Sequence, residues 1–136
     1  MLELPVAPAW VSAGLPYEPR SASLARQLVR VTLTCWGVDG LVDDALLVVS
    51  ELVGNAVKTG CQLEMTVRVI RLTAASVRVS VTDGCRALPV RIEADDGEES
   101  GRGVDLVHML TQGRWGVVPE AFGKTVHADL WVGRNP

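Results

Sequence analysis

Apolar residues in the first half of the chain recur at helical spacing in two segments. The first predicted helix begins after Pro19, has Ser21 or Ser23 as its N-cap, and ends near residue 36. The second begins at residue 39 or 40 and ends near residue 58. Their predicted buried faces are Leu24, Leu28, Val31 and Cys35 in the first helix, and Leu41, Ala45, Val48, Val49, Leu52 and Val53 in the second.

Alternation of apolar and polar residues replaces this helical pattern further along the chain. Four segments read as strands and pair as two hairpins: 62–72 with 77–82 around a turn at 73–76, and 114–118 with 125–132 around a turn at 119–124. Between the hairpins, the pattern predicts a loop at 84–100 and a third helix from about 103 to 110.

The order of these elements predicts an α+β fold. We expect a two-layer α/β sandwich, in which helices cover one face of a mixed, mostly antiparallel sheet. Prolines in residues 1–18 predict an extended N-terminal segment, with an edge strand near residues 2–6. Residues 19–134 should then form a single domain.

The composition excludes several classes of protein. The chain has 136 residues, 48% of them hydrophobic, which is enough for one packed core. Its net charge of −3 gives no broad basic surface for nucleic acid. No apolar run approaches the ~20 residues of a membrane span, and no secretion signal is evident. We therefore expect a cytoplasmic protein, whose three cysteines should be reduced and mostly buried.

Glu51 and Asn55 are the first candidates for chemistry. They are four residues apart in an apolar helix and should share one face. An amide oxygen suits Mg²⁺, which prefers oxygen ligands and retains water and phosphate oxygens. A carboxylate beside it could accept a proton from an attacking hydroxyl group. The alternative is that both residues belong to a solvated polar stripe on the helix.

Two further segments could serve a nucleotide. Asp83 and Gly84 follow a valine-rich strand, where a carboxylate could accept the exocyclic amine of adenine, although Asp-Gly is also an ordinary turn sequence. The segment Gly101-Arg102-Gly103 lies at the start of the third predicted helix. Backbone N–H groups at a helix N-terminus can bind phosphate. The same glycines could instead form a simple joint between loop and helix.

The order of the three segments resembles that of a known family, the GHKL ATPases. Residues 51–56 look like the N-box, Asp83-Gly84 like a shortened G1 box, and residues 101–104 like the G2 box. The short chain and the closing segment 123–126 look most like anti-sigma factors of the serine-kinase type, the RsbW/SpoIIAB group. The resemblance covers residues 20–132 and implies the Bergerat-type sandwich.

The resemblance also implies roles for individual residues. Glu51 would be the catalytic base and Asn55 the ligand of Mg²⁺. Asp83 would contact adenine, and Thr125 would sit beside it. Residues 86–100 would be the ATP lid. The predicted cofactor-binding set is Asn55, Asp83, Gly84, Gly101, Arg102, Gly103 and Thr125.

The implied function is an ATP- and Mg²⁺-dependent serine/threonine kinase. It would restrain a sigma factor and phosphorylate an antagonist with a STAS-type fold, with a homodimer as a family expectation. The chain has Cys85 where the G1 box has a glycine, which leaves a second hypothesis open: a non-catalytic interaction module with weakened nucleotide binding. A detached catalytic domain of a histidine kinase is a third, disfavoured because the sequence shows no dimerisation helix that carries a phospho-accepting histidine.

Overall fold

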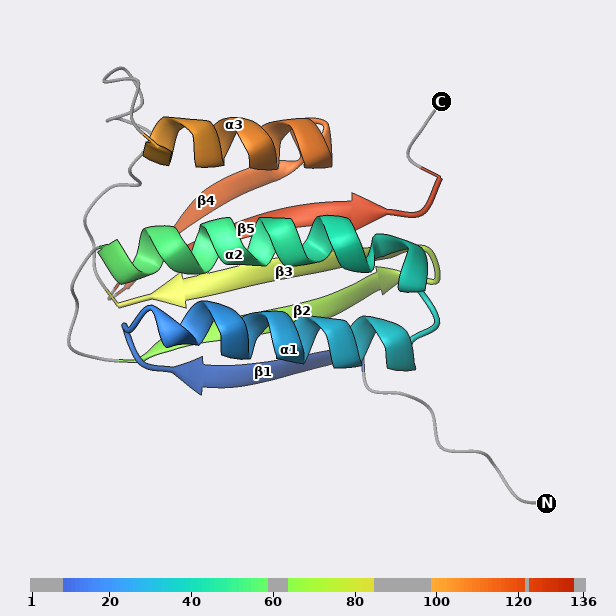
Figure 1. The fold of residues 1–136 in the computed structure, drawn as a ribbon, viewed down its shortest axis with the longest axis horizontal. Coiled ribbons are helices and arrows are strands. Elements are labelled where there is room, and N and C mark those ends of the chain that lie inside the picture. Colours follow the sequence, from blue (N-terminus) through green and yellow to red (C-terminus); the bar gives the residue numbers. More distant parts are fainter. Residues whose placement is uncertain (1–8, 59–63, 85–98, 122, 134–136) are drawn as a thin grey trace.

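The computed structural model describes residues 9–58, 64–84, 99–121 and 123–133 of the chain. These residues form two layers. Five antiparallel strands make one sheet in the order β1-β2-β3-β5-β4, and the helices α1, α2 and α3 all cover the same face of it (Figure 1). The predicted α+β sandwich is therefore confirmed, and every described strand pairing is antiparallel.

The strands are β1 (Trp10–Leu15), β2 (Met65–Thr73), β3 (Ser76–Asp83), β4 (Trp115–Glu120) and β5 (Gly123–Trp131). Both predicted hairpins are present, and the second has a tighter turn than predicted because β4 and β5 extend further toward each other. The edge strand expected near residues 2–6 lies outside the described residues. Strand β1 holds that edge of the sheet and lies within the segment predicted to be extended.

Helix α1 (Arg20–Cys35) differs from its prediction in two details. Its N-cap residue is Pro19, and the Ser21 hydroxyl donates a hydrogen bond to the Pro16 carbonyl instead of capping the helix. The buried row is Ser21, Ala25, Val29, Thr32 and Leu33. The predicted stripe is therefore wrong for Leu24, Val31 and Cys35, whereas Leu28 is partly buried against the core.

The displaced stripe has a packing reason. Helix α1 lies against both α2 and the sheet, and small side chains at residues 21 and 25 allow this close approach. The larger Leu24 and Val31 remain 38% and 56% exposed. Cys35 is also exposed, which contradicts the prediction of a buried thiol at this position.

Helix α2 (Val42–Lys58) follows a short 3₁₀ turn at Asp39–Leu41 and is the central helix of its layer. It packs against α1, α3, β3 and β5, as its all-round apolar character predicted. All six residues of the predicted buried face are buried. Across the interface, the inward side chains of β3 are Val77, Val79 and Val81, which complete the core.

Helix α3 (Glu99–Thr111) begins about four residues earlier than predicted. From residue 105 onward, its buried residues are Val107, Leu110 and Thr111, and its C-terminal end meets the second hairpin. There, the Trp115 indole N–H donates a hydrogen bond to His108 Nδ1 at 3.1 Å. The contact fixes the end of α3 against the start of β4.

Candidate functional site

Glu51 and Asn55 lie on α2 as their spacing predicted, on one side of the helix. Both are half-buried, whereas the neighbouring Leu52 and Ala56 face the core. Helix α2 is held against α1 by Arg26, whose guanidinium donates to the Ser50 hydroxyl at 3.1 Å. The pair is therefore on a rigid, well-packed element.

The three predicted segments lie toward the same end of the molecule. Figure 1 shows the C-terminal end of α2, the end of β3 and the first turns of α3 together at the left of the view, and α2 packs against both partners. Gly101, Arg102 and Gly103 lie inside the first turns of α3, because this helix begins at Glu99. The first N–H groups of any helix lack intrahelical acceptors, so this end of α3 keeps donors for an anion.

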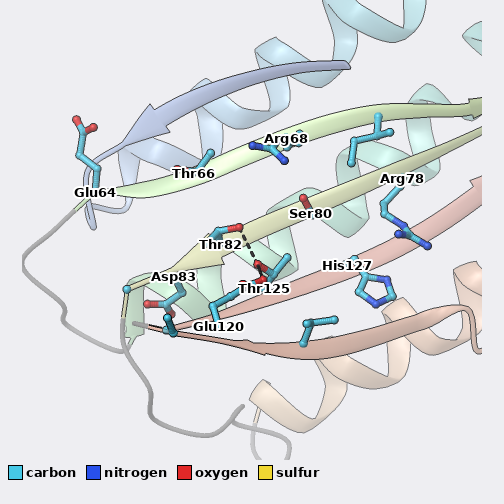
Figure 2. A pocket seen from close by; sticks show the side chains of 15 residues that line it. Glu64, Thr66, Arg68, Arg78, Ser80, Thr82, Asp83, Glu120, Thr125 and His127 are labelled. Carbon is cyan, nitrogen blue, oxygen red and sulfur yellow. Dashed lines mark hydrogen bonds between the residues drawn. The ribbon is translucent and has the colours of Figure 1, made fainter. Parts of the chain in front are cut away.

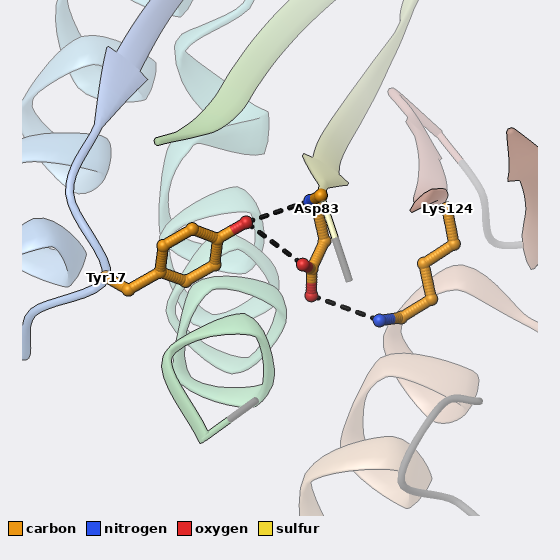
Figure 3. A network of polar contacts seen from close by, with 4 residues as sticks. Tyr17, Asp83 and Lys124 are labelled. Carbon is orange, nitrogen blue, oxygen red and sulfur yellow. Dashed lines mark hydrogen bonds and ion pairs between the residues drawn. The ribbon is translucent and has the colours of Figure 1, made fainter. Parts of the chain in front are cut away.

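Asp83 ends β3 and is almost completely buried, with its side chain 2% exposed. The Tyr17 hydroxyl donates to Asp83 Oδ1 at 3.0 Å, and the Lys124 ammonium group donates to Oδ2 at 3.0 Å (Figure 3). The Tyr17 oxygen in turn accepts the Gly84 backbone N–H at 2.9 Å. Both carboxylate oxygens therefore accept hydrogen bonds from the chain itself.

A buried charge is costly unless it is paired and hydrogen-bonded. Lys124 supplies the opposite charge for Asp83 and is itself only 9% exposed in its side chain. Tyr17 closes the other side of the carboxylate. Burial raises the pKa of the Tyr17 hydroxyl above its usual value, and Asp83 adds to the rise, although the Gly84 hydrogen bond opposes it.

The prediction that Thr125 lies beside Asp83 is wrong. Residues 83 and 124 are register partners, as are Thr82 and Thr125, so strand alternation puts Thr125 on the opposite face of the sheet. The Thr125 hydroxyl lies 2.8 Å from the hydroxyl of Thr82 and 3.0 Å from a Glu120 carboxylate oxygen. Lys124 is the β5 residue that reaches Asp83.

Gly123 is a second residue that sequence reasoning missed. A Cβ built at this position would come within 1.9 Å of the Asp83 carbonyl oxygen. Only glycine lets β5 pass this close to the end of β3. Lys124 carried a detectable signal, because it is in phase with the inward-facing Ala128 and Leu130 of β5. Tyr17 carried none, since nothing in its local sequence indicates a partner 66 residues away.

The helix-free face of the sheet carries a hollow of about 680 Å³ (Figure 2). Arg68, Arg78, Ser80, Thr82 and His127 point into it from three strands. The Arg78 guanidinium makes two hydrogen bonds to the Asp129 carboxylate, at 2.7 and 3.0 Å. This hollow lies across the sheet from α2 and does not include Glu51 or Asn55.

The residues present suit a magnesium nucleotide in part. Among the described residues, no three His, Cys, Asp or Glu side chains gather in a way that could hold a metal ion alone. Asn55 offers one neutral oxygen, which fits Mg²⁺ completed by phosphate oxygens and water. Asp83 has the carboxylate expected for a base amine, already paired with Lys124.

Comparison with known proteins agrees with this arrangement. A family model described as a histidine kinase-like ATPase domain matches residues 15–113. A crystal structure of the RsbU and RsbW domains of Rv1364c from Mycobacterium tuberculosis superposes with a TM-score of 0.67 at 20% sequence identity. The match covers 90% of this chain and 32% of that one, so this chain spans about a third of its length. No curated protein sequence matches. No helix among the described residues has the length and apolar character needed to cross a membrane.

Proposed function

The chain belongs to the histidine kinase-like ATPase domain family, and on this premise we propose that it is an ATP-dependent regulatory kinase of the RsbW type. Family membership implies ATP binding, usually with Mg²⁺. In its specific form, the proposal is that the protein restrains a sigma factor in the cytoplasm. It would release that factor under the control of an antagonist with a STAS-type fold, which it phosphorylates on serine or threonine.

The observation that carries this proposal is that the C-terminal end of α2, the end of β3 and the start of α3 lie toward the same end of the sheet, with α2 packed against both β3 and α3. It brings the helix with Glu51 and Asn55 to the element ends that carry Asp83 and Gly101. A nucleotide there would have its base near Asp83 and its phosphates near α2 and the start of α3. Phosphoryl transfer depends mainly on such positioning and on neutralisation of phosphate charge.

Two side chains of α2 would then divide the chemistry. The Asn55 side-chain oxygen would hold Mg²⁺, which neutralises phosphate charge when bound. The Glu51 carboxylate would accept the proton of the attacking hydroxyl group. The new bond joins the partner's hydroxyl oxygen to the γ-phosphorus, the bond from that phosphorus to the β-γ bridging oxygen breaks, and ADP leaves.

Substitutions on α2 test these roles. Glu51→Gln should keep Mg²⁺-ATP binding within about threefold, measured by calorimetry, and lower phosphoryl transfer at least about a hundredfold. Asn55→Ala should weaken Mg²⁺-dependent binding at least about tenfold. The matched control is Asp43→Asn, which removes an exposed carboxylate from the first turn of the same helix. Normal transfer by the Glu51→Gln protein would refute the assigned base.

One observation favours a second function. Both oxygens of Asp83 already accept hydrogen bonds from Tyr17 and Lys124. A base site satisfied by its own chain is the arrangement expected of a non-catalytic interaction module that keeps the family fold. Calorimetry with Mg²⁺-ATP at millimolar concentration separates the two functions. Absence of heat, together with an unchanged melting temperature, would favour the module.

A further inference from the structure

We propose that Lys124 determines the base selectivity of the nucleotide site. Its ammonium group is bonded to the carboxylate that would select a 6-amino purine. The site should therefore accept 6-oxo purine nucleotides, such as inosine triphosphate, about as well as ATP. This inference rests on the proposed function, because it concerns the same nucleotide site.

The position of Lys124 follows from the register of the sheet. Residues 83 and 124 are directly opposed, at the last residue of β3 and the second residue of β5. Their side chains point to the same face, and the Nζ–Oδ2 distance is 3.0 Å. Because residue 123 is a glycine, no side chain separates the two strands at this point. The pair is thus built into the sheet and does not depend on a mobile surface contact.

The second oxygen of the carboxylate is also engaged. Tyr17, from the connection between β1 and α1, donates to Oδ1 and receives the Gly84 N–H (Figure 3). Asp83 is therefore held from two sides by donors of the protein. An incoming exocyclic amine must compete with a hydroxyl group on one oxygen and an ammonium group on the other.

This competition is unequal. A hydrogen bond between an ammonium group and a carboxylate is charge-assisted at both ends and stronger than one from a neutral aryl amine. The amine of adenine thus gains little by approaching Asp83 while Lys124 remains in place. A carbonyl oxygen at purine position 6 is an acceptor, and the positive charge of Lys124 attracts it without breaking the ion pair.

The test compares two nucleotides on the intact chain. Calorimetry measures the dissociation constants of Mg²⁺-ATP and Mg²⁺-inosine triphosphate for the wild type and for Lys124→Met. Methionine is unbranched and nearly fills the same volume, but it carries no donor. The control is Lys58→Met, which changes the only other lysine of the chain. Circular dichroism and a melting curve establish that each variant is folded.

The expected wild-type ratio of the two constants is within about threefold of one. In Lys124→Met, the amine no longer competes with an ammonium group for the carboxylate, so ATP should be preferred roughly ten- to a hundredfold. Lys58→Met should retain the wild-type ratio. A wild type that prefers ATP by more than about tenfold overturns the proposal, even if the variant fails to fold.

The remaining outcomes separate this inference from the function on which it rests. If the wild type and Lys124→Met bind ATP but show the same nucleotide ratio, Lys124 does not determine selectivity, and the nucleotide-binding function stands. If no protein in the series binds either nucleotide, the proposed function fails and the inference about Lys124 fails with it.

Discussion

The Tyr17 hydroxyl group donates a hydrogen bond to Asp83 across 66 positions of sequence, with an oxygen–oxygen distance of 3.0 Å. Through this bond, the connection between β1 and α1 is joined to the end of β3. The same oxygen accepts the Gly84 N–H, so one phenol group holds both the side chain and the backbone at the strand end. The connection that follows the edge strand is thus hydrogen-bonded to the candidate base site.

The first prediction concerns the stability that this phenol group supplies. Tyr17→Phe keeps the ring but leaves the buried Asp83 and the Gly84 N–H each short of one partner. We expect the free energy of unfolding to fall by about 1–3 kcal/mol, measured by urea denaturation at pH 7. The control is Ser12→Ala at an exposed position of β1, which should change it by less than about 0.5 kcal/mol. Equal stabilities of the two variants would contradict this account.

The second prediction follows from the raised pKa of Tyr17, caused first by burial and then by Asp83. A raised pKa means that the folded state holds the Tyr17 proton more tightly than the unfolded state does. In the unfolded state, the pKa of this hydroxyl group is 10.0. The stabilisation is therefore complete below pH 10.0 and is lost as pH rises through the folded pKa. The free energy of unfolding, measured from neutral pH up to the folded pKa of Tyr17, should fall more steeply with rising pH in the wild type than in Tyr17→Phe. Parallel curves would exclude this linkage.

The layered fold could be predicted because its signals are local and repeated. The alternation in β2 and β3 and the apolar face of α2 each extend over several turns or residue pairs, so single exceptions do not obscure them. The stripe of α1 failed because hydrophobicity alone does not identify a helix face. Ser21 and Ala25 face inward because they are small enough for close packing, which depends on α2 and is absent from the local pattern.

The candidate site was less predictable, since its contacts depend on register. The spacing of Glu51 and Asn55 is a property of one helix and could be read directly. The choice between Lys124 and Thr125 required the pairing of β3 with β5, and a shift of one residue exchanges the two faces of the sheet. Tyr17 reaches Asp83 only through the folded chain, so no pattern near either residue reveals the contact.

The third prediction concerns His127 on the helix-free face. Burial and the charge of Arg78 lower the pKa of its imidazole below the usual 6.5, while Asp129 opposes the shift. Its Nδ1 is buried and has no hydrogen-bond partner among the described residues. The unfolded state binds the proton more readily, so this contribution to stability is complete above pH 6.5 and is lost as pH falls through the folded pKa.

A comparison of His127→Gln with the wild type measures this pH-dependent contribution of His127 to stability. The difference in unfolding free energy between the two proteins should change between neutral and mildly acidic pH, with the wild type losing more. Nuclear magnetic resonance of the imidazole protons gives the folded pKa independently. A folded pKa at or above 6.5 would contradict the assigned environment.

The fourth prediction is a gain of stability at Gly54. This glycine lies within α2, and a Cβ built on it meets nothing within 4 Å. Alanine loses less backbone entropy on entering a helix, so Gly54→Ala should raise the free energy of unfolding by about 0.5–1 kcal/mol. Thermal and urea denaturation both report this quantity. A loss of stability would show that this side of α2 is more crowded than the structure indicates.

The fifth prediction reverses that result at Gly123. A Cβ there would come within 1.9 Å of the Asp83 carbonyl oxygen, a backbone atom that cannot turn aside as a flexible side chain would. Gly123→Ala should therefore separate the ends of β3 and β5, weaken the Asp83–Lys124 ion pair and lower the free energy of unfolding by at least about 2 kcal/mol. Gly54→Ala is the matched control, because it adds the same methyl group in open space. Amide hydrogen exchange should rise first at the ends of these two strands. If Gly123→Ala is as stable as the wild type, the close approach of the strands at Asp83 is wrong, and the ion pair that depends on it is in question.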